Sequence, residues 1–253
     1  MDWEAPAIVL DARPFGEGDA VATVFTAAHG AHRGLARGAQ SRARAATWQP
    51  GNLIQARWVA RLADQLGSLS GEMIHAAAAL AMDDAPRLAI LSAACAVAAG
   101  ALPEREAHPR VFDALLHLIA HLPGAEDAPG AYVRWELLLL ADLGYGLDLS
   151  RCAVTGATEG LAYVSPRTGR AVAADAAGTW RERLLPLPGF LRGNGPPSDA
   201  AAWRDGLRLT GHFLARDAFG SRHLPLPNAR LLLYDRAERD ARPESARLES
   251  PDA

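Results

Sequence analysis

The clearest regular pattern in the chain is an alternation of apolar and polar side chains over residues 53–62. In an extended backbone, successive side chains point to opposite faces. One face then carries Ile54, Ala56, Trp58, Ala60 and Leu62, and the other carries Leu53, Gln55, Arg57, Val59 and Arg61. We therefore predict a strand that packs one face against a core and presents guanidinium groups on the other.

Shorter β-branched runs precede this strand. Residues 7–12 and 21–26 predict a hairpin, because the segment between them, residues 14–19, is rich in turn-forming residues. If residues 33–37 are also extended, Arg33, Leu35 and Arg37 share a face. A fifth strand is predicted near residues 67–74. Five short strands in this part of the chain fit an OB-fold, although other small barrels have the same pattern.

From about residue 72 the sequence becomes rich in alanine and leucine, which predicts helices over residues 86–99, 109–122 and 130–143. Prolines lie near their starts and glycines follow their ends, as helix boundaries require. Residues 151–178 contain more Gly, Thr and Ser and predict an irregular or β-ribbon insert. Ser198 is the predicted N-cap of a further helix that reaches about residue 218, and Pro227 begins the last one.

These patterns predict an α+β chain with three parts. Residues 1–78 form a five-stranded barrel, residues 79–236 form a mainly α-helical domain with the insert at 151–178, and residues 237–253 form a disordered tail. The tail is charged and poor in large apolar residues, so it has little to bury.

Composition is typical of an ordinary globular chain, with 253 residues, 49% hydrophobic residues and a net charge of -3. No apolar run is long enough to span a bilayer, and the first residues lack the pattern of a signal peptide. We therefore expect a cytoplasmic protein.

Two cysteines are too few for a disulfide framework, and Cys95 lies in an alanine-rich stretch that predicts a buried free thiol.

Charge is distributed unevenly along the chain. Between residues 20 and 63 there are six arginines and no acidic residue; they are Arg33, Arg37, Arg42, Arg44, Arg57 and Arg61. Clustered guanidinium groups are typical of a surface that neutralises phosphates, so nucleic acid is the first partner to test. The simpler alternative is a solvated basic face. Trp48, beside this segment, is a candidate for stacking on bases, whereas Trp58 is assigned to the core.

The chain contains no lysine, and all 26 basic residues are arginine. This excludes a nucleotide-hydrolysing motor with a P-loop lysine and an enzyme with a Schiff-base lysine.

The best metal candidate is Asp113 with His117 and His121, because four-residue spacing places all three on one face of a predicted helix. The glutamate of a zinc-protease helix is missing, so a polar helix face is the favoured interpretation and a metal-dependent hydrolase is the alternative. No serine-nucleophile or dinucleotide-binding motif is present. We therefore expect no catalytic residues, no cofactor and no enzymatic activity.

Several motifs together resemble the RecO family of bacterial recombination mediators, in its alphaproteobacterial branch. They are HGAHRGLARG at residues 29–38, QPGN at 49–52, LPERE at 102–106, WELLLLADLGYGLDLS at 135–150, CAVTG at 152–156, VSPRTGRAV at 164–172 and LRLTGHFL at 207–214. The resemblance extends from Trp3 to about Leu233, with the motifs in the family's order.

The resemblance implies an N-terminal OB-fold and a helical C-terminal domain. It also implies binding to single- and double-stranded DNA, annealing of complementary strands, and help in loading RecA onto strands coated by single-strand-binding protein. The implied partners are RecR and the acidic tail of single-strand-binding protein, and the implied location is the nucleoid. Arg33 and Arg37 lie in the basic segment of the family, and Arg42, Arg44 and Arg57 fall where basic residues are usual in it. Together with Arg61, they are the predicted DNA-binding residues. An OB-fold RNA-binding protein is the closest alternative.

Two further expectations depend on the resemblance. Some members bind structural zinc through two cysteine pairs in the insert, but here Cys152 is followed by Thr155 and the second pair is absent around residues 163–169. A lone thiolate cannot form a closed four-ligand site, so we predict a zinc-ribbon-like insert without metal. Arg110 and Arg134 are candidates for the rim of a pocket that binds the acidic tail.

Overall fold

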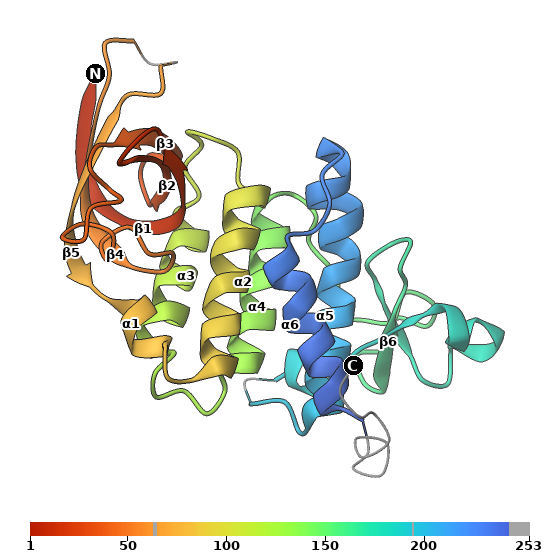
Figure 1. The fold of residues 1–253 in the computed structure, drawn as a ribbon. Helices are drawn as coiled ribbons and strands as arrows, with labels where there is room; N and C mark the ends of the chain where they lie inside the picture. The colour runs from red at the N-terminus through yellow and green to blue at the C-terminus, as the bar shows by residue number, and fades with distance from the viewer. Residues whose placement is uncertain (63–64, 194, 243–253) are drawn as a thin grey trace. The chain divides into compact units, whose positions relative to one another are not determined.

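The first five strands of the computed structural model close into a barrel (Figure 1). They are β1 (Asp2–Phe15), β2 (Asp19–Thr26), β3 (Gly30–Ala36), β4 (Leu53–Val59) and β5 (Ser68–His75). The order around the barrel is β1-β2-β3-β5-β4, and every neighbouring pair is antiparallel except β3 and β5. This five-stranded closed barrel confirms the predicted α+β class and the OB-type N-terminal fold.

The structure describes residues 1–62, 65–193 and 195–242. The chain divides into two units, Met1–Ala125 and Glu126–Ala253. The first unit therefore includes the barrel and the helices that follow it directly. The predicted domain boundary at residue 78 lies inside this unit and stays a prediction.

The alternating pattern of β4 is confirmed over most of its predicted length. Ile54, Ala56 and Trp58 are buried in the barrel, whereas the intervening residues are not fully buried. The strand ends at Val59, so Leu62 leaves the pattern and is 60% exposed. The fifth strand predicted near residues 67–74 is confirmed, because β5 pairs with β4 over residues 68–75.

Gly30 begins β3 in a conformation that other residues rarely adopt, with a φ of +67°. A neighbouring segment runs beside it, since Glu104 forms a parallel bridge with Ala31 and the Arg105 amide donates to the Ala31 carbonyl at 2.8 Å. A Cβ atom at Gly30 would lie 1.9 Å from the carbonyl oxygen of Glu106. Only glycine therefore fits this position without moving backbone.

We expect Gly30→Ala to lower the free energy of unfolding by about 2–5 kcal/mol, because it adds backbone strain to a steric clash with residue 106. Gly16→Ala is the matched control, since Gly16 has a φ of +63° and a Cβ atom added there would meet no atom within 4 Å. The control should lose only the backbone contribution of about 1–2 kcal/mol. Urea denaturation of both variants measures the difference, and equal losses would show that the close approach is tolerated.

Three helices complete the first unit: α1 (Ala77–Ala81), α2 (Ala85–Ala101) and α3 (Pro109–His121). The carboxylate of Asp84 accepts a hydrogen bond from the Arg87 amide at 3.0 Å and caps α2. Phe112 of α3 packs edge-on against Phe25 of β2, with ring centroids 5.5 Å apart. The two longer helices agree with the predictions to within two residues at each end.

The second unit contains α4 (Ala128–Asp142), α5 (Ala200–Phe213) and α6 (Asn228–Asp240). In its core, the Arg230 guanidinium contacts the carboxylate of Glu136 at 2.6 and 3.0 Å, and the two residues are 1% and 0% exposed. The Tyr132 hydroxyl donates to the same carboxylate at 2.7 Å, and the Thr210 hydroxyl donates to it as well. One buried polar network thus joins the three helices.

Two sequence predictions in this unit are corrected. The N-cap of α5 is Asp199 and not Ser198, because the Asp199 carboxylate accepts from the Ala202 amide at 2.7 Å. Helix α6 continues to Asp240, four residues into the segment expected to be disordered, since Ala237 still lies on its buried face. Residues 243–253 of that segment lie outside the described residues.

The predicted insert contains a three-stranded sheet in the order β7-β6-β8. The strands are β6 (Leu161–Val164), β7 (Ala171–Ala173) and β8 (Leu185–Pro186), with the short helical turn η1 (Gly178–Arg183) between β7 and β8. The β-ribbon prediction is confirmed, and the sheet extends beyond its predicted end at residue 178.

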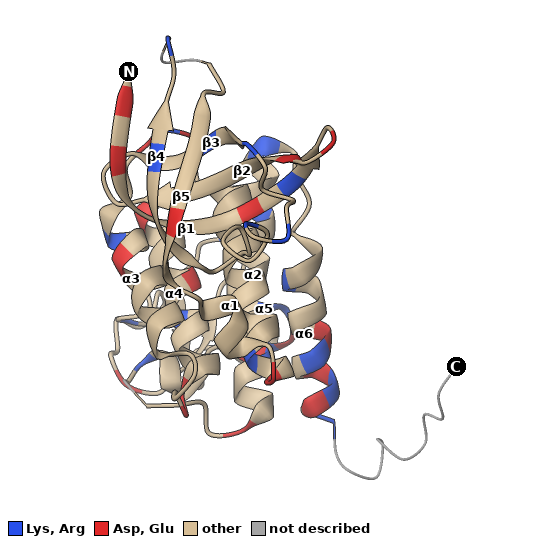
Figure 2. Ribbon diagram, turned by 60° about the vertical axis from the view of Figure 1, so that its left-hand side comes forward, with Lys and Arg blue, Asp and Glu red and all other residues tan. Residues whose placement is uncertain are grey.

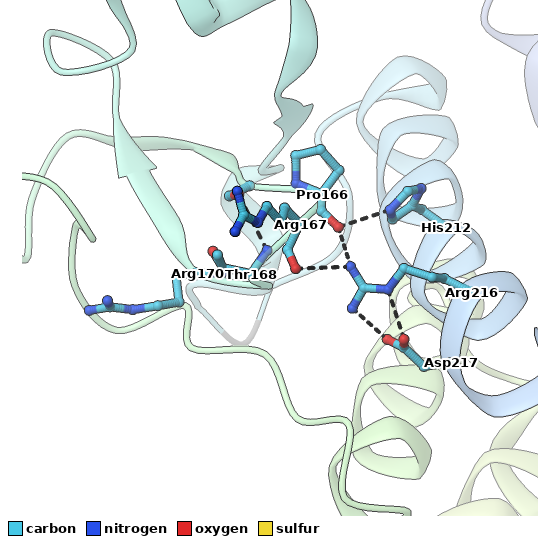
Figure 3. A network of polar contacts seen from close by, with 8 residues as sticks. Pro166, Arg167, Thr168, Arg170, His212, Arg216 and Asp217 are labelled. Carbon is cyan, nitrogen blue, oxygen red and sulfur yellow. Dashed lines mark hydrogen bonds and ion pairs between the residues drawn. The ribbon is translucent and has the colours of Figure 1, made fainter. Parts of the chain in front are cut away.

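A turn of the insert is fixed to the end of α5 and the π-helical turn η3 (Leu214–Phe219), as Figure 3 shows. The Arg216 guanidinium donates to the carbonyl oxygens of Pro166 and Arg167, the latter at 3.2 Å. Asp217 holds this guanidinium through two contacts of 2.7 Å, and His212 Nε2 lies 3.1 Å from the Pro166 carbonyl oxygen. Side chains from the helical part therefore hold this turn in place.

Candidate nucleic-acid interface

A groove with a volume of about 860 Å³ lies on the surface of the barrel. It is bordered by β1, β3, β4 and β5 and by the segment between β3 and β4. Its lining residues are Glu4, Leu35, Arg37, Arg44, Thr47, Trp48, Gln55, Arg57, Val59, Ser68, Leu69, Ser70, Gly71 and Glu72. The barrel thus has a concave surface that is lined in part by the segment of sequence in which the arginines cluster.

Three of the predicted DNA-binding arginines line this groove. Arg57 projects from the outer face of β4, Arg37 follows the end of β3, and Arg44 lies in the turns between those strands. The Arg44 Nη1 atom donates to the Arg37 carbonyl oxygen at 3.1 Å, which holds its guanidinium beside the end of β3. All three residues are exposed, so their remaining donors are accessible to a ligand.

The groove also contains two carboxylates, from Glu4 on β1 and Glu72 on β5. In Figure 2 a basic segment of β4 lies close to an acidic segment of β5. One carboxylate oxygen of Glu4 accepts from Gln55 Nε2 at 3.1 Å. Asp2 lies 3.7 Å from Arg57, but both side chains are well exposed, and such pairs contribute little. The acids moderate the positive charge of the groove and leave its guanidinium groups available.

The other three predicted arginines do not line the groove. Arg33 pairs with Glu104 at 2.6 Å, Arg42 is exposed in the turns after β3, and Arg61 follows the end of β4. Sequence reasoning missed this division because Glu104 lies about 70 residues after Arg33 in the sequence and is brought beside β3 only by the segment that follows α2.

Trp48 lines the groove but is only 6% exposed and belongs to the barrel core. Its burial argues against the stacking role considered for it. Trp58 is buried as predicted, and its indole Nε1 donates to the carbonyl oxygens of Arg33 and Leu66 at 3.2 and 3.0 Å.

The two arginines considered for a partner pocket lie in different units. Arg110 is exposed in the first turn of α3. Arg134 of α4 forms an ion pair with Asp127 and donates to the Gly195 carbonyl oxygen at 3.1 Å. Their role in partner binding stays a prediction.

The predicted metal candidate lies along α3. The rings of His117 and His121 are 4.0 Å apart between centroids, and His121 Nδ1 lies 2.8 Å from the His117 carbonyl oxygen. Over residues 1–62, 65–193 and 195–242, no group of three or more His, Cys, Asp or Glu side chains is arranged to hold a metal ion. The geometry therefore gives no support to the metal-dependent hydrolase.

Both cysteines are buried and free. Burial raises the pKa of Cys95 to about 12, so this thiol is protonated at neutral pH. The Cys152 sulfur accepts hydrogen bonds from the amides of Val154 and Ala173 at 3.4 and 3.3 Å. Cys152 thus ties the start of the insert to β7.

None of the described helices is both long and apolar enough to cross a lipid bilayer.

Comparison with known proteins gives two family matches, one over the barrel and one over most of the remaining chain. Residues 1–77 match the family model "Recombination protein O N terminal", and residues 82–224 match "Recombination protein O C terminal". The DNA repair protein RecO of Granulibacter bethesdensis is 61% identical over 238 residues, which cover 93% of this chain and 95% of that protein. The RecO proteins of Acidiphilium cryptum and Gluconacetobacter diazotrophicus are 61% and 57% identical over 242 and 240 residues. These alignments cover 94% and 93% of this chain, and 96% and 94% of the relatives. The chain therefore belongs to the RecO family of DNA repair proteins.

Proposed function

We propose that this protein is a DNA-binding mediator that acts without ATP and without a catalytic site. It binds single- and double-stranded DNA, anneals complementary strands and assists the loading of RecA onto strands coated by single-strand-binding protein. RecR and the acidic tail of single-strand-binding protein are its proposed protein partners. The proposed location is the cytoplasm, in association with the nucleoid.

The observation that carries this proposal is the groove in which Arg37, Arg44 and Arg57 converge on the outer surface of an OB-type barrel. Guanidinium groups bind phosphate oxygens without regard to base sequence, so the groove suits a DNA backbone. Two strands held by cationic side chains repel each other less, and base pairing can then select the complement. This mechanism needs no nucleotide hydrolysis, in keeping with the absence of lysine from the chain.

Fluorescence anisotropy of a labelled DNA oligonucleotide across a salt series tests the proposal, with annealing of its complement followed in the same samples without ATP. We expect sequence-independent binding that weakens steeply with salt, by about 0.7 in the log-log slope for each phosphate contact on a single strand, together with faster annealing. Absence of binding at low salt would contradict the proposal. Tighter binding to RNA than to DNA of the same sequence would favour an RNA-binding role instead.

A further inference from the structure

Trp180 is the most exposed tryptophan among the described residues, with 61% of its surface accessible. It lies in η1, the short turn of the insert between β7 and β8. The Arg183 guanidinium lies over its ring, 5.5 Å from the ring centroid. An indole that remains in solvent beside a guanidinium has no role in a core, so its position needs another explanation.

A second aromatic and cationic pair lies in the same part of the insert. The Arg181 guanidinium lies 5.7 Å from the centroid of Tyr163 in β6, the central strand of the small sheet. Arg181 and Arg183 are both exposed, whereas Tyr163 is partly buried. Two pairs of a ring and a guanidinium group thus come from η1 and β6, and we call these four residues the insert cluster.

The insert cluster is supported by ordered backbone. The Trp180 amide donates to the Ala177 carbonyl at 3.0 Å, and the Leu184 amide donates to the Arg181 carbonyl at 3.2 Å. The turn at residues 165–170 that leads from β6 to β7 is held by His212 and Arg216 (Figure 3). The rings and guanidinium groups therefore come from a surface that is already formed before a ligand arrives.

The charge of this region differs in sign from that of the whole chain. Residues 151–193 contain six arginines and three acidic residues, a net charge of +3, whereas the whole protein has a net charge of -3. The exposed side chains of the insert therefore present positive charge together with the faces of aromatic rings. This combination is complementary to a single strand, which offers phosphates and unpaired bases together.

We propose that the insert cluster is a second binding surface for single-stranded DNA, separate in its residues from the barrel groove. A base stacks on Trp180, with Tyr163 as the neighbouring aromatic residue, and the guanidinium groups of Arg181 and Arg183 contact the adjoining phosphates. Stacking on a ring is tolerant of base identity, so this surface binds strands without sequence preference. The inference rests on the proposed function in that it requires the chain to bind DNA. The insert cluster would give each protein molecule a second site, besides the barrel groove, at which it binds single-stranded DNA.

The test is fluorescence anisotropy of a labelled thymine oligonucleotide with the full-length protein, across a salt series. We expect Trp180→Ala to weaken binding about fivefold or more with little change in salt dependence, because stacking is not an ionic contact. Trp180→Phe keeps a ring and should bind within about twofold of wild type. Arg183→Gln should instead lower the slope of log affinity against log salt by about 0.7.

Leu232→Ala is the matched control, since Leu232 of α6 is 66% exposed and belongs to the same unit. It should bind like wild type. Suppose that Trp180→Ala and Arg183→Gln both bind DNA with the affinity and salt dependence of the wild type, and that substitution of the groove arginines weakens binding. The insert cluster is then not a DNA-binding surface, and the proposed function stands. If the wild-type protein binds no DNA, both proposals fail. A Trp180→Ala variant that binds DNA normally but no longer binds a labelled acidic peptide would overturn the DNA assignment in favour of a protein partner.

Discussion

Replacement of Arg230 by methionine is expected to lower the free energy of unfolding by about 3–5 kcal/mol, the loss typical of a buried ion pair that loses one partner. The substitution keeps much of the side-chain volume but leaves the carboxylate of Glu136 buried without a counter-charge. That carboxylate is 0% exposed, so water cannot replace the two contacts it would lose. Chemical denaturation followed by circular dichroism measures the effect.

The protonation states in this network explain why the loss should be large. Burial opposes the charge of Arg230, yet the adjacent Glu136 carboxylate raises the pKa of the guanidinium, which therefore stays charged. Burial and the Glu136 charge both raise the pKa of Tyr132, so its hydroxyl keeps the proton that it donates to Glu136. Arg230 thus stays charged and Tyr132 stays protonated beside Glu136, and removal of Arg230 leaves the carboxylate with hydroxyl donors alone.

Two further variants separate this effect from a general loss of arginine. Arg208→Met changes an exposed residue of α5 and should alter stability by no more than about 0.5 kcal/mol. The double substitution Glu136→Leu with Arg230→Met removes both charges and should recover most of the loss, because an apolar replacement of a buried pair is often neutral. A single Arg230→Met variant as stable as wild type would show that Glu136 takes up a proton or reaches water at little cost.

The barrel was predictable because its strands carry a local signal. The alternation at residues 53–59 depends only on the two-residue repeat of an extended chain, and the hairpin of β1 and β2 depends on the turn residues between them. The exact ends were less predictable. The apolar and polar alternation runs on to Leu62, but β4 ends at Val59 where its pairing with β1 reaches Asp2.

Long-range contacts were beyond sequence reasoning. Glu136 lies in a strongly apolar run, which marks it as an unusual charge, but its partner Arg230 is 94 residues away. Likewise, Arg33 looked equivalent to Arg37 in the sequence, and only the path of residues 104–106 beside β3 gives it the partner Glu104. Charge clustering in sequence therefore pointed to the part of the barrel that carries the groove, but not to which of its arginines line that groove.

Combined substitution of Arg37, Arg44 and Arg57 by glutamine is expected to weaken binding to single-stranded DNA about 100-fold at 0.1 M salt. Each lost phosphate contact removes about 0.7 from the slope of log affinity against log salt, which is a factor of about five at this concentration. Three contacts together lower the slope by about 2. Anisotropy titrations at several salt concentrations give both the affinity and the slope.

The control for this variant is a second triple substitution, of Arg33, Arg42 and Arg61 by glutamine. It removes the same charge from the same segment of sequence, but these three residues do not line the groove. If DNA binds in the groove, the control should lose less than about tenfold in affinity and keep most of its salt slope. If both variants lose equally, the total positive charge of the segment determines affinity and the groove has no special role. The comparison therefore distinguishes a site built by the fold from a charge pattern already visible in the sequence.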